Sequence, residues 1–289
     1  MNYAAHIIFM LAVYTLLVIS LDLLVGHLGL LVLCQSAFYA IGAYVSSVLM
    51  TRWSVPFPYA ASVAIVTTMF VSWPIALAAR RLRGDAVVLA SFAFLLVLND
   101  VLKNWRGVTG GLDGLRDIPA IHLASFKITS LTFQAILAVA LAVAGWLIVR
   151  RIVGSAFGPF LHALRDDPRG AVGLRVPAIG AYTKSFCLSS GIAAIAGVLY
   201  ASYATYISPA IFDVDLSILL LAMVLLGGAA TRAGPVAGAG IVVVVAEMAR
   251  AIGMGSPAVG SLHFILTGLV LIIFSTIRPQ GVLGGYEFR

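Results

Sequence analysis

The chain has 289 residues, of which 62% are hydrophobic and 10% are charged. Soluble domains contain roughly 45–50% apolar and about 25% charged residues, so this composition excludes a soluble domain with a hydrated surface. It favours an all-α, polytopic integral membrane protein. The net charge of +7 does not indicate a nucleic-acid partner, because the basic residues lie between apolar runs and not along one exposed face.

The apolar runs predict eight or nine transmembrane helices in a single transmembrane domain that covers residues 1–289, since one span needs about 20 mostly apolar residues. The first run begins almost at Met1 and has neither a basic leader nor a convincing small-residue cleavage site, so we expect it to be retained as a helix. The predicted spans, in chain order, are 5–24, 29–50, 57–79, 86–102, 130–149, 180–205, 217–230, 235–251 and 260–277.

The seventh segment, 217–230, is shorter than a full span and ends in Gly227-Gly228. We interpret it as a re-entrant or broken helix, which a membrane tolerates only where protein or a water-filled cavity satisfies the backbone. Small residues recur at helix-packing spacing on either side of it. Gly191, Ala194 and Gly197 form one stripe and the pair Gly234 and Gly238 another, which predicts close helix approach.

Lys and Arg collect in alternate connections of the predicted bundle. They follow the third, fifth, seventh and last spans, whereas the 206–216 loop contains two aspartates and no basic residue. Basic loops stay on the cytoplasmic side of a membrane. The prediction is therefore that the 150–179 loop and the C-terminus are cytoplasmic and that the N-terminus faces outside.

No pattern in the chain indicates an enzyme. The nearest string to a phosphate-binding loop, 180–185, lacks the glycine before Lys184 and has the wrong spacing. The five histidines show no metal-ligand spacing, and no nucleophile lies beside a base, so we predict no catalytic residue and no metal site. Cys34 and Cys187 lie inside apolar runs, which favours buried, reduced thiols.

Ionisable residues inside the predicted spans are few and lie near span ends. They include Asp22, Asp100 and Glu247, the last of which is spaced to pair with Arg250 on one helix face. Intramembrane charges are functional candidates by default, so a proton relay stays an alternative. A transporter driven by an ion gradient usually has a charged or unwound site near the midplane, and the scarcity of such charge disfavours it.

The cytoplasmic loop of about 150–179 predicts two short helices. One covers about 158–165, and the second begins with Asp167 as N-cap and Pro168 at the first helical position, a favoured start. A short amphipathic helix parallel to the membrane would dock into a groove of a partner. The alternative is an interfacial linker that only connects two spans.

Five stretches, in order along nearly the whole chain, resemble the branched-chain amino acid ABC transporter permeases, in particular the LivM type. A span that contains Ser189-Ser190-Gly191 follows the string 163–174. A Thr-Gly-Gly-x-x-Gly loop at 109–114 follows Asn104-Trp105. The stretches that carry the resemblance are 26–44, 109–115, 163–201, 217–238 and 278–284.

The resemblance implies a non-enzymatic transport subunit in a bacterial inner membrane. Its expected partners are membrane lipid, a second permease subunit in a heterodimer, two cytoplasmic ATPases that hold ATP and Mg, and a periplasmic substrate-binding protein; the chain itself would bind no cofactor. The resemblance also implies that an ATPase-coupling segment is formed by Ala163, Leu164, Arg165, Asp166, Asp167, Pro168, Arg169, Gly170, Ala171, Gly173 and Leu174.

The substrate implied is a branched-chain or other hydrophobic amino acid. The chain departs from the family pattern at 29–35 and 90–95, which are more apolar here, so urea, amides and aromatic acids stay open as substrates of the same permease type. Two further functions stay open as well, a secondary transporter driven by an ion gradient and a membrane scaffold. Guessed from position, the translocation pathway contains Ser36, Tyr39, Thr109 and Asp113.

Overall fold

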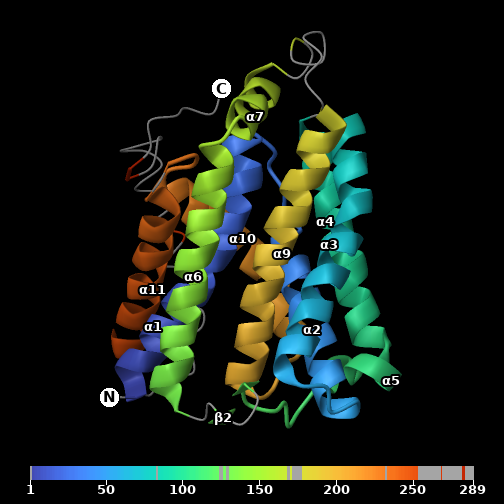
Figure 1. Cartoon of the computed structure of the whole chain (residues 1–289), viewed down its shortest axis with the longest axis vertical. Coiled ribbons are helices and arrows are strands. Elements are labelled where there is room, and N and C mark those ends of the chain that lie inside the picture. The colour runs from blue at the N-terminus through green and yellow to red at the C-terminus, as the bar shows by residue number, and fades with distance from the viewer. Residues whose placement is uncertain are drawn as a thin grey trace.

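The computed structural model describes residues 2–82, 84–123, 126–127, 130–167, 170, 178–231, 233–252, 268 and 282–283. Within them the regular elements are helices, apart from one hairpin of two two-residue strands and an isolated bridge between Leu115 and Ile207, so the all-helical prediction is confirmed (Figure 1). The elements are α1 Asn2–Asp22, η1 Leu23–His27, α2 Gln35–Arg52, α3 Phe57–Arg81, α4 Asp85–Asn104, α5 Arg106–Thr109, η2 Gly111–Asp113, β1 His122–Leu123, β2 Phe126–Lys127, α6 Leu131–Val153, α7 Phe157–Asp166, α9 Ala178–Ala204, η3 Pro209–Phe212, α10 Val214–Gly227 and α11 Gly234–Ile252.

Six segments of the described chain are long and apolar enough to cross a membrane. They begin with Tyr3–His27, which joins α1 to η1, and end with Pro209–Gly227, which joins η3 to α10. The remaining four are α3, α4, α6 and α9. The more polar α2 and the shorter apolar stretch Gly234–Met248 of α11 lie in the same bundle (Figure 1). The predicted ninth span, 260–277, lies outside the described residues.

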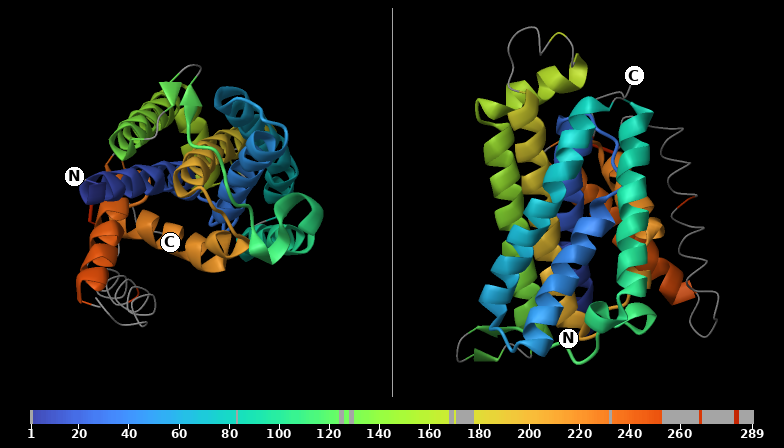
Figure 2. Two further views of the ribbon diagram at one scale, coloured as in Figure 1. Left: turned by 90° about the horizontal axis from the view of Figure 1, so that it is seen from below. Right: turned by 90° about the vertical axis from the view of Figure 1, so that its right-hand side faces the viewer.

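The helices cross the bundle in alternating directions, so their connections gather at two ends (Figures 1 and 2). The α7 end holds α7, the α3–α4 turn and the turn from α10 to α11. The α5 end holds the N-terminus, α5 and the β1–β2 hairpin, whose register pairs His122 with Lys127. The predicted alternation of loops is thereby confirmed, because the connections that follow the third and fifth spans share one end.

The centre of the bundle is formed by α1 and α9, while α3 and α4 are peripheral. In the most apolar stretch of each helix, 72% of the Tyr3–His27 residues and 78% of the Ala178–Ala204 residues are buried, against 28% for both α3 and α4. The outer helices expose large apolar side chains such as Phe70 and Val97. This surface is suited to lipid and not to water.

Close helix approach follows the predicted small residues. A Cβ atom on Gly197 of α9 would lie 2.3 Å from the Tyr39 carbonyl oxygen of α2, and one on Gly238 of α11 would lie 1.9 Å from the Met223 carbonyl oxygen of α10. Side chains at these positions would push the backbones apart. The prediction that both stripes pack helices closely is confirmed.

Candidate functional site

The segment between α1 and α2 is a broken helix inside the bundle. The α-helix changes to a π-helical turn in η1, a distortion that is frequent at functional sites. Residues 28–34 are not helical, and Gly29 has a φ of +75°. The backbone there is satisfied by protein, since the Leu30 amide donates to the Leu24 carbonyl at 2.9 Å and the Leu33 amide donates to Ser91 Oγ at 2.9 Å. The second span, predicted as 29–50, therefore begins as a helix only at Gln35.

The first turn of α2 carries a buried polar cluster. Ser36 Oγ lies 2.6 Å from Ser217 Oγ of α10, and Gln35 Nε2 donates to Ser20 Oγ of α1 at 2.5 Å. Ser189 of α9 donates to the Ser20 carbonyl at 2.7 Å. All five side chains are almost fully buried. The cluster ties four helices together at the point where the helix resumes.

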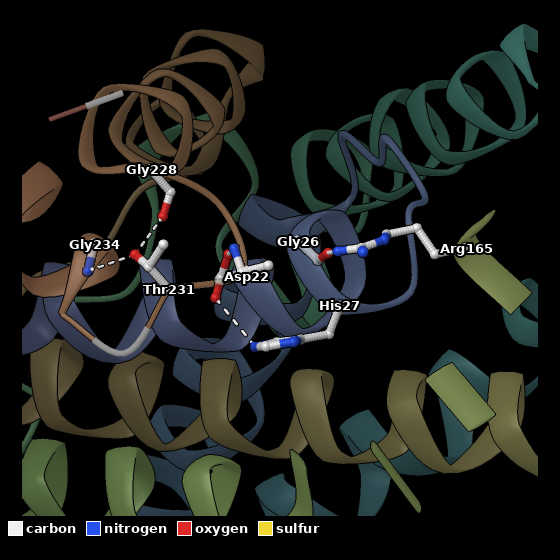
Figure 3. Close-up of polar contacts among 8 residues, drawn as sticks. Asp22, Gly26, His27, Arg165, Gly228, Thr231 and Gly234 are labelled. Carbon is white, nitrogen blue, oxygen red and sulfur yellow. Dashed lines mark hydrogen bonds and ion pairs between the residues drawn. The ribbon is translucent and has the colours of Figure 1, made fainter. Parts of the chain in front are cut away.

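Helix α7 packs directly on this break. The α7 side chains of Leu161 and Leu164 are buried. Arg165 Nη1, also of α7, donates to the Gly26 carbonyl of η1 at 3.0 Å (Figure 3). A Cβ atom on Gly29 would lie only 2.4 Å from Arg165 Cγ, so the absence of a side chain there is what lets the arginine reach η1. The break and α7 thus form a single contact surface.

Asp22 connects the same break to the turn between α10 and α11. Its Oδ1 accepts a hydrogen bond from the Ala230 amide at 2.8 Å, and its Oδ2 lies 3.7 Å from His27 Nε2 (Figure 3). A Cβ atom on Gly26 would clash with both Asp22 Oδ1 and the Ala230 amide nitrogen, at 2.3 Å and 2.4 Å. The carboxylate is 3% exposed, so these partners replace water for a buried acid.

The α10–α11 turn is itself held by a threonine. Thr231 Oγ1 donates to the Gly228 carbonyl at 2.8 Å and accepts from the Gly234 amide at 3.0 Å, at the start of α11 (Figure 3). Gly228 and Ala230 both have positive φ, of 102° and 60°. The turn therefore has a fixed shape that presents the Ala230 amide to Asp22. The prediction of a re-entrant or broken helix at 217–230 is wrong, because α10 is continuous from 214 to 227 and ends at this turn.

Two histidines lie where η1, α7 and the α10–α11 turn meet. The rings of His27 and His162 of α7 are 5.5 Å apart, edge to face. Burial lowers the pKa of His162 and the neighbouring Arg165 lowers it further, with an opposing effect from Asp166. The imidazole of His162 is therefore neutral near pH 7. No group of three or more His, Cys, Asp or Glu side chains among the described residues is arranged to hold a metal ion.

The residues predicted to contact an ATPase divide into two sets. Asp166, Asp167 and Gly170 are exposed at the α7 end. Leu164 is buried and Ala163 is partly buried, while the Arg165 side chain is only 12% exposed and is directed toward η1. The first predicted helix, 158–165, is α7, Phe157–Asp166. The other predicted members lie outside the described residues: Pro168, Arg169, Ala171, Gly173 and Leu174.

The four residues guessed for a translocation pathway do not form one site. Ser36 belongs to the buried polar cluster, and the Tyr39 ring packs edge to face against Phe212 at 5.0 Å. Thr109 holds the α5-end loop, since its hydroxyl donates to the Leu102 carbonyl at 2.7 Å. Asp113 is exposed in the same loop. Only the first two lie on α2, directly after the broken helix.

Sequence reasoning did not select His27, Ala230 or Thr231 as site residues. The available signal was the Gly26-His27-Leu28-Gly29 string, whose two glycines flank the histidine. Glu247, the residue singled out as a relay candidate, accepts a hydrogen bond from the Tyr3 hydroxyl at the α5 end of α1. It thus lies at the far end of α1 from Asp22.

Comparison with known proteins agrees with this architecture. Over residues 3–275 the chain matches the family described as Branched-chain amino acid transport system / permease component. It is 27% identical to the high-affinity branched-chain amino acid transport system permease protein LivM of Salmonella typhimurium, over 95% of this chain and 68% of that protein. It is 25% identical to LivH of Escherichia coli K12, over 95% and 92%. No solved structure matches the chain. The chain is a multi-pass membrane protein that belongs to the permease family of branched-chain amino acid transport systems.

Proposed function

We propose that this chain is one of two permease subunits of an ATP-driven importer and that its α7 end faces the cytoplasm. The observation that carries the proposal is the bond from Arg165 of α7 to the Gly26 carbonyl of the broken helix. A short helix at the surface is thereby linked to the π-helical turn η1, where the break between α1 and α2 begins. Family membership supports the same role, with ATP hydrolysis carried out by separate ATPase subunits.

In this mechanism, closure of the ATPases moves α7, and the movement reaches the bundle by two routes. The first route runs through Arg165 to η1, and from there to the first turn of α2, where the Ser36–Ser217 contact joins α10. The second runs through Asp22 to the Ala230 amide and the start of α11. Coupling of this kind requires an element with two arrangements that both sites bias. The broken helix 23–34 is the element we assign to that role.

The substrate we propose is a branched-chain or other hydrophobic amino acid, delivered from outside by a soluble binding protein. The relatives are named for high-affinity branched-chain amino acid transport, and the first turn of α2 offers hydroxyl and amide groups but no charged side chain. Urea, amides and aromatic acids are the alternative cargoes of the same permease type. Uptake by proteoliposomes with each labelled compound separates them.

The test of the coupling role is a charge reversal on the exposed edge of α7. Asp166→Arg with Asp167→Arg is expected to abolish co-purification of the ATPase subunits and to remove ATP-dependent uptake. Both side chains are exposed, but Asp166 Oδ1 also accepts from Arg165 Nε at 3.1 Å, so Asp167→Arg alone is measured beside the double variant and thermal unfolding curves check that both fold. The matched control is Asp113→Arg, which reverses an exposed charge at the opposite end of the bundle.

A different result would overturn the proposal. If the purified chain moves amino acids in liposomes without any ATPase, driven by a proton or sodium gradient, it is a secondary transporter. Glu247 is the residue to test in that event, because it is an intramembrane acid. If the α7 variant and the Asp113→Arg control lose ATPase binding equally, α7 is not the docking helix.

A further inference from the structure

A cavity of about 320 Å³ lies between α1, α6, α7 and the start of α11. Its acidic wall carries the carboxylate of Asp22, with the imidazoles of His27 and His162 beside it. A basic residue, Arg150, lines the cavity at the end of α6. Its other lining residues are largely apolar. The transport mechanism proposed above runs through Asp22 and Ala230, which line this cavity, but it assigns no ligand to the cavity.

The acidic wall has unfilled hydrogen-bonding capacity. His27 is 8% exposed, and its Nδ1 has no hydrogen-bond partner among the described residues. Asp22 Oδ1 is bonded to the Ala230 amide, while Oδ2 has a contact of 3.7 Å to His27 Nε2, longer than a hydrogen bond. An ionised carboxylate accepts about four hydrogen bonds. A buried carboxylate of this kind is complementary to a cation that carries N–H donors.

The part of the cavity lining that Arg150 forms is complementary to an anion. The Arg150 guanidinium lies over the Trp146 ring, with Cζ 5.2 Å from the ring centroid. Stacking of this kind orients the planar guanidinium, whose donors match phosphate oxygens. One cavity therefore presents an acid and a base, which suits a ligand with both an ammonium and a phosphate group.

An apolar groove continues from the same cavity along α1 and α6. Trp146 lines both the polar cavity and a second cavity of about 230 Å³, whose other walls include Leu11, Ala12 and Val143. A third apolar cavity of about 330 Å³ follows and shares Ile8 and Val139 with the second. The groove thus follows the membrane-spanning direction, as an acyl chain does.

The depth of the polar cavity fits a lipid headgroup. Asp22 lies five residues before the end of the Tyr3–His27 span, which is about 7 Å along a helix. Arg150 lies three residues before the end of the Leu131–Val153 span. Both residues are therefore near the polar boundary of a hydrocarbon core about 30 Å thick, with the apolar groove directed toward its middle.

We propose that this surface is a binding site for one phospholipid with a primary-amine headgroup, of the phosphatidylethanolamine class. Its ammonium group binds Asp22 Oδ2 and His27 Nδ1, its phosphate binds Arg150, and one acyl chain lies in the groove between α1 and α6. A bound lipid of this kind supports the α1–α6 contact beside α7. The site does not depend on the proposed transport function.

The test is lipid binding to the purified full-length chain, followed by native mass spectrometry during titration with phospholipids of identical acyl chains. Phosphatidylethanolamine is expected to bind about tenfold more tightly than phosphatidylcholine, because the trimethylated headgroup has no N–H to donate to a buried carboxylate. Asp22→Asn is expected to remove this preference. Arg150→Gln is expected to weaken both lipids about equally, and Val143→Trp to weaken both by filling the groove.

The matched control is Arg151→Gln, since Arg151 is an exposed neighbour that does not line the cavity. It is expected to bind lipid like the wild type. Equal binding of the two lipids by the wild type would overturn the proposal, and so would an unchanged preference in Asp22→Asn. If free phosphoethanolamine or leucine binds as tightly as the lipid, the cavity takes a soluble zwitterion and the lipid assignment is wrong.

Discussion

The two ends of the bundle are joined in different ways. At the α5 end, the connections pair through backbone: the Leu115 and Ile207 amides donate to each other's carbonyls at 2.9 and 3.0 Å, and the Ile118 amide donates to the Thr205 carbonyl at 3.1 Å. At the α7 end, the links from Arg165 to Gly26 and from Ala230 to Asp22 rely on side chains, and the Val282 and Leu283 amides also donate to the Leu226 and Gly227 carbonyls at 2.9 and 3.2 Å.

We call the paired backbone around Leu115, Ile118, Thr205 and Ile207 the frame. We call the contacts of Arg165 with Gly26 and of Ala230 with Asp22 the junction. Paired backbone segments separate only when the chain itself moves, and here Gly114 brings them so close that an added Cβ atom would lie 2.0 Å from the Ile207 carbonyl oxygen. A bond made by one side chain breaks and reforms when a rotamer changes, at a net cost of about 1–3 kcal/mol for a charged group. We therefore expect conformational change at the α7 end and a fixed geometry at the α5 end.

The largest effect is expected from a glycine in the frame. Gly114 has a φ of +69°, and a Cβ atom there would lie 2.0 Å from the Ile207 carbonyl oxygen. Gly114→Ala is expected to destabilise the protein by about 3 kcal/mol, because the positive φ is strained for alanine and the clash breaks the backbone pair. Thermal unfolding in detergent measures the loss.

The control for this change is Gly107→Ala in the neighbouring helix α5. A Cβ atom on Gly107 would meet nothing within 4 Å, so this substitution is expected to leave the unfolding temperature nearly unchanged. If both substitutions destabilise the protein equally, the pairing of Leu115 with Ile207 does not hold the frame.

A smaller effect on stability, but a larger one on coupling, is expected at the junction. Arg165→Met keeps the unbranched stem that packs over Gly29 and removes the bond to the Gly26 carbonyl. The expected loss of stability is about 1–2 kcal/mol. ATP hydrolysis by the assembled complex is expected to continue while uptake per ATP falls several-fold.

Uptake and hydrolysis measured on the same proteoliposomes check this prediction. A matched comparison is Arg151→Met, which removes an exposed arginine at the end of α6 and leaves the bond from Arg165 to η1 in place. Equal uptake per ATP in the two variants would show that the link from Arg165 carries no coupling.

The helical bundle was predictable from the sequence because lipid demands long apolar segments, and those segments are visible as runs. The break at 28–34 was not. Leu30, Leu31, Val32 and Leu33 are as apolar as any spanning helix, so hydropathy extends the second span back to residue 29. Their backbone is satisfied by contacts distant in sequence, such as Leu33 to Ser91, which no local pattern encodes.

The candidate site shows the same limit. The string around Arg165 marked α7 as informative, but the direction of the arginine depends on Gly29, 136 residues earlier, where a side chain would fill its place. Asp22 was visible as an intramembrane acid, yet its partner is a backbone amide with no residue signature. The sequence therefore indicated which segments contribute to the candidate site, but not which of these segments contact one another.

The smallest predicted effect is a pH dependence at the junction. Burial and the nearby Arg165 lower the pKa of His162 from its ordinary value of 6.5, against an opposing effect of Asp166. A histidine whose folded pKa is lowered stabilises the fold as the neutral ring. That contribution is complete above the unfolded pKa and is lost as the pH falls through the folded one.

We therefore expect the wild type to lose stability as the pH falls below the ordinary histidine pKa of 6.5 toward the lower pKa of His162 in the folded protein. His162→Gln has no titrating ring and is expected to lose less over the same range. Because Arg165 and Asp166 are present in both proteins, the difference between their unfolding curves reports His162 together with the effect of its removal on the neighbouring His27. Parallel curves would show that protonation of His162 does not destabilise the packing of α7. The contacts of Arg165 and Asp22 would then hold the junction, and the histidine pair would contribute no pH-dependent stability.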